Sequence, residues 1–358
     1  MKIFTILGCR PEIIRLSEII KKIDKCIGEE NHFIFNTMQN YNDNLNADFF
    51  EEFGLRETDY NCYGESQSFS KQLAAIFPQL ETELIKFKPD KFLCLGDTNS
   101  SLGAIVAKRL GIPVYHMEAG NRCHSFKSPE EVNRHIIDHI TDIHMPYTQR
   151  SKENLIAEGI RNHKIFVIGN PIYEILQQYD SNIQRSNILK TLNVVPGQYI
   201  LVTLHRAENV DTLYLIEFLN ALRTLSDRHK IIFSCHPHTR KNITPDFLVS
   251  INEKDFKILD PLGFIDFVCL EANALCVMSD SGTVQEECAI LDVPNVVLRD
   301  YTERPETQEH GNCIISGHEV KNVVMAFDAV IKAKSSGCPV EYKTDKVSDN
   351  VLRILLSV

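Results

Sequence analysis

The chain has 358 residues and a mass of 40.9 kDa, carries a formal net charge of −10, and is 43% hydrophobic and 24% charged. This composition is typical of a folded globular protein and excludes disordered and collagen-like chains. The length predicts two domains. The acidic balance argues against a nucleic-acid-binding protein, because phosphate contacts require a basic surface.

The sequence predicts neither a membrane-spanning segment nor a secretory leader. No run approaches about 18 uninterrupted apolar residues. Met1 leads directly into the strand-like run Lys2–Leu7, without a basic region, an apolar region and a cleavage site. We therefore expect a cytoplasmic protein that has no membrane partner.

The eleven cysteines form no Cys-x-x-Cys pair, and most lie in apolar runs such as Phe92–Leu95. We interpret them as reduced core residues, which argues against a disulfide scaffold and against a thiolate zinc site. The segment Cys235-His236-Pro237-His238 is rich in potential ligands, but no cluster of cysteines or carboxylates completes the set. No metal ion is expected.

Short β-rich runs alternate with amphipathic stretches of about a dozen residues, which predicts βαβ units and parallel sheets. The first series of predicted strands comprises Ile3–Leu7, His32–Asn36, Lys91–Leu95, Val114–Met117, Ile143–Pro146 and Ile165–Ile168. The second series comprises Tyr199–Leu204, Lys230–Ser234, Phe256–Leu259, Leu275–Met278, Pro294–Leu298 and Cys313–Ile315.

A hinge is predicted at Gly169-Asn170-Pro171 and along the polar, helix-like stretch that follows to about Ser186. The fold class is therefore α/β, with two doubly wound, Rossmann-like domains. We place them at residues 1–172 and 173–358, and we expect the final helix to pack back on the N-terminal domain.

Ligands of doubly wound sheets bind beyond the carboxyl ends of the strands, so the residues after each strand are the candidates for function. The first strand is followed by Gly8-Cys9-Arg10-Pro11-Glu12, with Arg15 one turn further, which suits an anion at a helix N-terminus. Taken alone, a plain βα turn with solvated arginines is the simpler interpretation. No Gly-x-Gly-x-x-Gly motif follows any strand, so no nicotinamide cofactor is expected.

Three carboxylates follow later strands of the first series. Asp97 follows the third strand, where it suits either chemistry or a helix cap, and Glu118 ends the fourth. Glu130 lies four residues before Arg134 on a predicted helix, and the alternative interpretation of that spacing is an ordinary surface ion pair.

Several strands of the second series are followed by groups that suit proton transfer and phosphate binding. His205 follows a strand, and imidazole titrates near neutral pH, although a core histidine remains the alternative. The segment Met278–Glu287 reads as a strand, a small polar turn and a helix whose first amides are free to hold a pyrophosphate. Glu287 is placed to reach a ribose diol, and Arg304 follows another strand.

Taken together, these motifs resemble the non-hydrolysing UDP-N-acetylglucosamine 2-epimerases, which have the two-domain glycosyltransferase-B architecture. The matching motifs, in order, are Gly8-x-Arg10-Pro11-Glu12, Gly96-Asp97-Thr98, Glu118-Ala119-Gly120, Pro129-Glu130-Glu131-x-Asn133-Arg134, His205-Arg206, Asp280-Ser281-Gly282-x-x-Gln285-Glu286-Glu287 and Glu303-Arg304-Pro305-Glu306. They cover nearly the whole chain.

Within that family the sequence looks most like the branch that converts UDP-2-acetamido-2,6-dideoxy-L-talose to UDP-N-acetyl-L-fucosamine for bacterial capsule and O-antigen synthesis. Arg15 stands where the N-acetylglucosamine enzymes usually have lysine, and the segment from Glu118 to Glu130 is shorter. Cys9 departs from the threonine usual in both branches. The alternative substrate pair is UDP-GlcNAc and UDP-ManNAc.

The resemblance implies that UDP is eliminated to leave a glycal and is then added back, in the cleft between the two domains. It implies four acid/base residues, namely Asp97, Glu118, Glu130 and His205. It also implies UDP contacts from Arg10, Ser281, Gly282, Glu287 and Arg304, with Phe267 near uracil and Arg15, Arg134 and His236 as further anion contacts. No cofactor is implied, and a homodimer is expected.

Three rival functions belong to other classes. A glycosyltransferase of the same architecture needs an acceptor and at most one base, whereas three acids in the first domain suit proton transfer on two faces of a sugar. A non-catalytic sensor of nucleotide sugars needs no such acids. A hydrolysing epimerase releases UDP.

Overall fold

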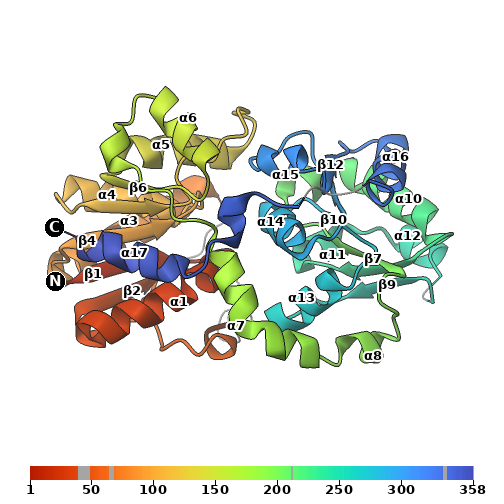
Figure 1. The fold of residues 1–358 in the computed structure, drawn as a ribbon, viewed down its shortest axis with the longest axis horizontal. Helices are drawn as coiled ribbons and strands as arrows, with labels where there is room; N and C mark the ends of the chain where they lie inside the picture. The colour runs from red at the N-terminus through yellow and green to blue at the C-terminus, as the bar shows by residue number, and fades with distance from the viewer. Residues whose placement is uncertain (39–48, 64–67, 211–212, 253, 334–336, 358) are drawn as a thin grey trace. The chain divides into compact units, whose positions relative to one another are not determined.

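The computed structural model describes residues 1–38, 49–63, 68–210, 213–252, 254–333 and 337–357. The chain forms two compact units, shown in Figure 1. The first comprises Met1–Ile175 and Val340–Val358, and the second comprises Leu176–Pro339. Helix α7 (Pro171–Arg185) carries the chain from one unit to the other.

The first unit is built on a six-stranded parallel sheet in the order β3-β2-β1-β4-β5-β6. Its strands are β1 (Ile3–Leu7), β2 (His32–Asn36), β3 (Tyr60–Asn61), β4 (Lys91–Leu95), β5 (Val114–Met117) and β6 (Ile143–Met145). Its helices are α1 (Arg10–Ile27), α3 (Phe69–Phe87), α4 (Ala104–Arg109), α5 (Pro129–Ile140), α6 (Gln149–Ala157) and α17 (Val347–Leu356), with 3-10 turns at Glu29–Asn31, Ser101–Gly103, Asn162–Lys164 and Val340–Lys343.

The second unit repeats this plan, with a six-stranded parallel sheet in the order β12-β11-β10-β7-β8-β9. Its strands are β7 (Tyr199–Thr203), β8 (Lys230–Ser234), β9 (Phe256–Leu259), β10 (Cys276–Ser279), β11 (Asn295–Val297) and β12 (Cys313–Ile315). Its helices are α8 (Ile188–Leu192), α9 (Ala207–Val210), α10 (Tyr214–Ser226), α11 (Pro237–Asn242), α12 (Pro245–Ser250), α13 (Phe264–Ala272), α14 (Gly282–Leu291), α15 (Pro305–Glu309) and α16 (Val320–Val330).

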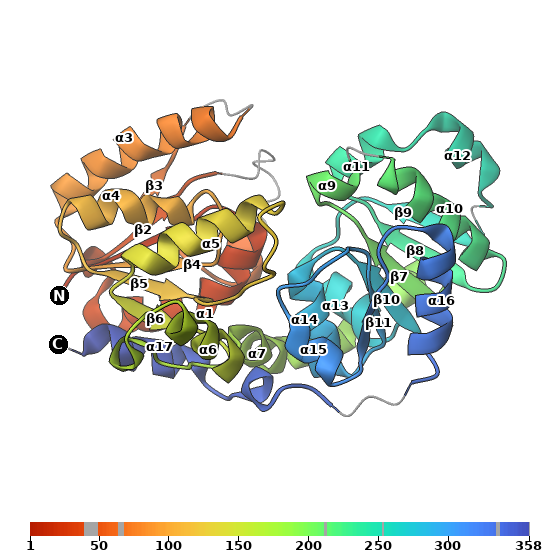
Figure 2. The same cartoon turned by 90° about the horizontal axis from the view of Figure 1, so that it is seen from above.

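Helices cover both faces of each sheet, which explains why the strands are apolar on both sides. In the first unit α3, α4 and α5 lie over one face, while α1 and α17 pack together over the other (Figure 2). In the second unit α10 and α16 pack against each other on one face, and α13 and α14 lie on the other (Figures 1 and 2). All five residues of β1 are buried for this reason.

The strand order reverses between β1 and β4 in the first sheet and between β7 and β10 in the second. At such a switch point the two loops that leave the neighbouring strands diverge and open a crevice for a ligand. The segments after these four strands therefore lie where each unit is expected to bind a ligand. They include Arg10, Asp97, His205 and Ser281.

The strand predictions are confirmed to within one residue at each end, with one exception. Ile165–Ile168 is not a strand, and only Ile165 forms a bridge, to His144. Phe166 and Ile168 donate their amides to the carbonyls of His144 and Pro146. Pro146 has no amide to return a bond, so the ladder cannot continue. The two-residue strand β3 was too short to be predicted from the sequence.

All eleven cysteines are free thiols, and eight of them are buried, as expected of core residues. Within the described ranges, no helix combines the length and the apolar character that crossing a membrane requires.

Candidate active site

The first unit pairs two of the predicted site residues, one on the helix that follows β1 and one directly after β5. Arg15, on α1, donates from Nη1 to Oε2 of Glu118 at 3.0 Å, and both side chains are buried. Asn121 donates to the other carboxylate oxygen at 3.2 Å. A buried, hydrogen-bonded ion pair of this kind fixes both groups in place.

The backbone of Glu118 is unusual, because its φ of 62° lies in the left-handed region that non-glycine residues rarely adopt. Two residues later, Gly120 also has a positive φ, and a Cβ there would lie 2.2 Å from the carbonyl oxygen of Ser151. The loop is therefore shaped by a close approach to α6. Such strain is concentrated at functional sites, which supports a functional role for Glu118.

A second ion pair joins Asp97, which follows β4, to Arg134 of α5. Arg134 also lies 3.1 Å from Oε2 of Glu131, and Asn133 donates to the carbonyl of Asp97 at 2.8 Å. A Cβ built on Gly96 would lie 3.6 Å from Glu118 Oε2, so the Glu118 carboxylate lies beside the Asp97 loop. The structure thus brings two predicted acids and two predicted cations to one edge of the first sheet.

The other two predicted residues of this unit flank that edge. Glu130 lies in the first turn of α5, and its carboxylate accepts a hydrogen bond from the Ser128 hydroxyl at 2.6 Å. Arg10 is the first residue of α1, and its guanidinium lies 4.5 Å from the centre of the Phe49 ring.

Glu12 is a buried acid of the same edge that the sequence reasoning left out of the site. Its carboxylate accepts from the amides of Gly8 and Cys9 at 2.6 and 3.1 Å, and from the Thr98 hydroxyl at 2.5 Å. Burial raises its pKa to about 7. Glu12 therefore ties the loop after β1 to the loop that carries Asp97. In the sequence, only its position in the Gly8–Glu12 motif marked Glu12 as a candidate site residue.

Behind these loops lies a buried polar network centred on Asp138. Its Oδ1 lies 2.8 Å from His116 Nδ1, while Oδ2 accepts from the Gly120 amide at 3.0 Å and from Arg122 at 2.8 Å. The other nitrogen of His116 lies 2.8 Å from the Gly96 carbonyl. Burial alone would raise the pKa of Asp138, but His116 and Arg122 outweigh it and lower the pKa. The network therefore fixes the position of the loop that carries Asp97, through the Gly96 carbonyl, and of the loop that carries Glu118, through the Gly120 amide.

In the second unit, the buried carboxylate of Asp280 orients His205. Asp280 Oδ1 lies 3.1 Å from His205 Nδ1, and the Asp280 carboxylate also accepts from the backbone amides of His205 and Arg206 at 3.2 and 3.0 Å. Burial would raise the pKa of Asp280, but His205 and these hydrogen bonds bring it to about 2. A hydrogen bond from Nδ1 to this carboxylate leaves Nε2 of the half-exposed imidazole available to a ligand.

The N-terminus of α14 offers free amides beside a cation. Ser281 is the N-cap and Gly282 the first helical residue. A Cβ on Gly282 would lie 2.9 Å from Cζ and Nη1 of Arg304, so only glycine lets the guanidinium lie this close to the helix start. The first amides of a helix lack intrahelical partners and favour an anion.

Arg304 is held by two buried carboxylates. Its Nε donates to Glu286 at 2.7 Å, and its Nη1 lies 3.0 Å from Glu303. Glu303 also pairs with Arg206 at 3.1 Å and with Arg299 at 2.7 Å. These contacts fix the guanidinium, but they also offset its positive charge locally.

Three further predicted residues lie in the second unit. Glu287 is buried one turn into α14 beside Glu271, whose pKa is raised by its own burial and then by the negative charge of Glu287. Burial lowers the pKa of His236, and the neighbouring imidazoles of His205 and His238 lower it further. Phe267 on α13 is 8% exposed, so most of its ring is covered by protein.

The two units therefore carry side chains and backbone amides that suit proton transfer and diphosphate binding. The first unit presents the ion-paired acids Glu118 and Asp97, and the second presents an oriented imidazole and a helix N-terminus beside an arginine. Acids and bases at fixed positions transfer protons, and free amides with cations bind phosphate. The roles of the individual residues stay predictions.

Known proteins resemble this chain along almost its whole length. A family model described as UDP-N-acetylglucosamine 2-epimerase matches residues 26–356. A Methanocaldococcus jannaschii protein named UDP-N-acetylglucosamine 2-epimerase is 39% identical, with 99% of each chain covered. A Pseudomonas aeruginosa protein named UDP-2,3-diacetamido-2,3-dideoxy-D-glucuronate 2-epimerase is 32% identical, with 88% of each covered.

Solved structures are also similar to this chain over almost its whole length. The crystal structure of the M. jannaschii UDP-GlcNAc 2-epimerase in complex with UDP-GlcNAc and UDP matches with a TM-score of 0.92 and 38% identity, over 99% of both chains. The Neisseria meningitidis enzyme bound to UDP-GlcNAc matches with a TM-score of 0.89 and 29% identity, over 99% of this chain and 100% of that one.

These similarities confirm the fold class and the family, while the finer placement in the L-talose branch finds no support among these relatives. The matched structures share the two Rossmann-like domains. The chain therefore belongs to the family of non-hydrolysing UDP-N-acetylglucosamine 2-epimerases and is an isomerase of UDP-sugars.

Proposed function

We propose that this protein interconverts UDP-GlcNAc and UDP-ManNAc by inverting C2 of the sugar. The observation that carries this proposal is the near full-length similarity to the M. jannaschii protein, which is named for UDP-GlcNAc and was solved with UDP-GlcNAc and UDP bound. The ion-paired acids at the strand ends supply the groups that such a reaction needs.

The C2 proton of a nucleotide sugar is not very acidic, so a route that avoids a free carbanion is favoured. In the proposed route a base removes this proton while the bond between C1 and the bridging oxygen breaks. The C–H electron pair forms the C1–C2 double bond of a glycal, and the diphosphate leaves with the C1–O pair. UDP then adds back to C1 while an acid protonates C2 on the opposite face, so atoms and charge balance.

Groups near both faces of the ring are required, because the proton leaves from one face and returns to the other. Glu118, Asp97 and Glu130 are the candidate acids of the first unit, and His205 is the candidate of the second. Asp280 acts through His205 by orienting its ring. Glu12 supports the Asp97 loop through Thr98.

The leaving diphosphate requires positive electrostatic potential. Ser281, the amides of the first turn of α14 from Gly282 onward and the fixed guanidinium of Arg304 are the proposed groups, and Glu287 is the proposed ligand of the ribose. Arg10, Arg15, Arg134, His236 and Phe267 are the further proposed contacts. A homodimer also stays a prediction.

The second candidate is the conversion of UDP-2-acetamido-2,6-dideoxy-L-talose to UDP-N-acetyl-L-fucosamine. Arg15 in place of lysine and the short segment between Glu118 and Glu130 favour it. The P. aeruginosa relative is named for a third UDP-sugar, so family membership alone does not fix the sugar. A role in bacterial capsule or O-antigen synthesis depends on this second candidate.

A direct comparison of the two substrates tests the proposal. Purified protein is incubated with each UDP-sugar, and C2 inversion is followed by NMR. We expect kcat/KM for UDP-GlcNAc to exceed that for the L-talose derivative at least ~10-fold, which corresponds to about 1.4 kcal/mol of differential transition-state binding. A preference for the L-talose derivative would replace the proposal with the second candidate, and a requirement for a sugar acceptor would indicate a glycosyltransferase.

A further inference from the structure

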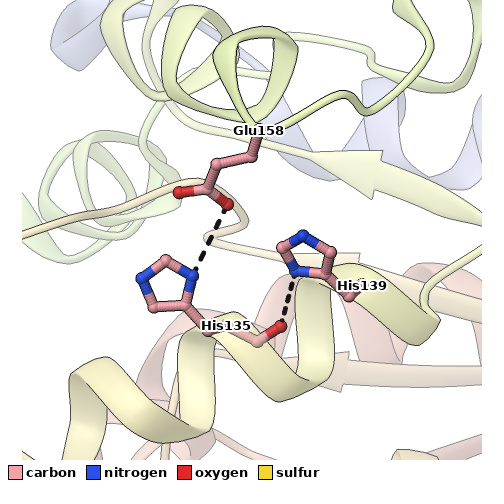
Figure 3. Close-up of side chains that lie close together, drawn as sticks. All are labelled: His135, His139 and Glu158. Atoms are coloured by element: carbon pink, nitrogen blue, oxygen red, sulfur yellow. Dashed lines mark hydrogen bonds and ion pairs between the residues drawn. The ribbon is translucent and has the colours of Figure 1, made fainter.

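His135 and His139 of α5 and Glu158 at the end of α6 form a cluster outside the candidate active site (Figure 3). Each offers one ligand atom, and these atoms all lie within 4.8 Å of one another. The two histidines are one helical turn apart and therefore lie on one face of α5, a spacing at which helices chelate metal ions. The segment Cys235–His238, which the sequence analysis rejected as a metal site, supplies no such group among the described residues.

One ring nitrogen of His139 is engaged by the backbone of α5. Its Nδ1 lies 2.8 Å from the carbonyl oxygen of His135, and the dashed line in Figure 3 marks this hydrogen bond. Because a carbonyl only accepts, Nδ1 donates this hydrogen bond, and Nε2 is the nitrogen that is left for a metal ion. Metal-bound histidines use the same kind of bond to fix their tautomer and orientation.

His135 is held between two carboxylates. Its Nδ1 lies 3.7 Å from Oε2 of Glu158, and its Nε2 lies 3.8 Å from Oε1 of Glu131. Nδ1 is thus the ring nitrogen of His135 that faces Glu158. Nδ1 of His135, Nε2 of His139 and Oε2 of Glu158 are therefore the candidate ligand atoms.

Glu158 is fixed from behind by Arg122. The guanidinium donates from Nε to Oε1 at 2.7 Å and from Nη2 to Oε2 at 2.6 Å. A carboxylate has about four lone-pair positions, so Oε2 retains the capacity to bind a cation. Arg122 also offsets the negative charge of Glu158, so the affinity of this cluster must come mainly from the two imidazoles.

We propose that His135, His139 and Glu158 bind one divalent transition-metal ion of the Zn²⁺ type. Tetrahedral coordination at about 2.1 Å places the ligand atoms about 3.4 Å apart, so they must close by somewhat over 1 Å. His139 is exposed and His135 is partly exposed, so rotations of these two side chains toward Glu158 allow this closure. Water completes the coordination.

The ligand set selects among metals. Two neutral imidazoles and one partly neutralised carboxylate suit Zn²⁺, Ni²⁺, Co²⁺ or Cu²⁺. Mg²⁺ and Ca²⁺ require several oxygen ligands and have no such set here. A bound ion would link α5 to the end of α6 and therefore stabilise the folded protein.

Calorimetric titration of metal-free protein with ZnCl₂ tests the proposal. We expect one equivalent to bind, at least ~10-fold more weakly after His135→Ala and after His139→Ala, while MgCl₂ gives no binding. His163→Ala is the matched control, because His163 is an exposed histidine in another turn of the same unit, and this variant should bind Zn²⁺ as the wild type does.

Equal Zn²⁺ affinity in the wild type and both cluster variants, or no binding by the wild type, would overturn the proposal. Anomalous scattering from zinc-soaked crystals gives a readout that does not depend on how the variants fold, and it should place the ion between His139 Nε2 and Glu158. Neither measurement involves turnover, so neither depends on the proposed function.

Discussion

Replacing Glu118 by glutamine should lower kcat for C2 epimerisation at least ~100-fold, because a positioned acid or base contributes about that much. Asp97→Asn and His205→Ala should have effects of the same size. Glutamine and asparagine keep the shape of the side chain and one acceptor for Arg15 or Arg134, so the loss would report on proton transfer. Steady-state kinetics with NMR detection of the product measures the effect.

Asp142→Asn is the matched control for the two acids. Asp142 precedes β6 at the opposite end of the same sheet, where it pairs with Lys108 at 2.6 Å and accepts from the Val114 amide at 3.0 Å. This variant should retain wild-type kcat. Circular dichroism and thermal unfolding show whether each variant is folded, and a folded variant with near-normal kcat removes its residue from the list of catalytic groups.

UDP binding should weaken about 10- to 100-fold in Arg304→Ala and in Glu287→Gln, because each loses a charge-assisted contact worth roughly 1.5–3 kcal/mol. Arg304→Ala also leaves Glu286 and Glu303 without one of their partners, so this variant tests folding as well as binding. Gly282→Ala avoids that difficulty, since its Cβ would displace the guanidinium without removing it. Calorimetry with UDP gives the dissociation constants.

Arg228→Ala is the control for this series. Arg228 forms an exposed ion pair with Asp328 at 3.0 Å in the same unit, and exposed pairs contribute little. Its UDP affinity should equal that of the wild type. Unchanged affinity in Glu287→Gln and Gly282→Ala would refute the placement of the diphosphate and ribose at the start of α14.

The strands could be predicted because parallel strands covered on both faces read as uninterrupted apolar runs, as in Ile3–Leu7 and Tyr199–Thr203. The candidate site followed from topology, since residues such as Asp97 and Ser281 come directly after strands at the two switch points. The strand predicted at Ile165–Ile168 was wrong because the apolar composition of this segment does not reveal its partner. That partner includes Pro146, which has no amide to return a hydrogen bond.

Contacts between distant elements could not be predicted. Asp280 is recognisable as a polar residue after a strand, but its pairing with His205 depends on β7 and β10 being neighbours in the sheet. The third ligand of the His135–His139 pair comes from the end of another helix. The identity of the sugar depends on contacts with its substituents, and relatives that share this family are named for different UDP-sugars.

One NMR experiment tests elimination and re-addition of UDP most directly. UDP-GlcNAc with an isotopic oxygen between C1 and phosphorus is incubated with the protein in deuterium oxide. The account predicts UDP-ManNAc that carries deuterium at C2, together with migration of the label into non-bridging positions of the β-phosphate, because freed UDP rotates before it adds back. Product that retains its C2 proton, or a label that stays in the bridge through many turnovers, would contradict it.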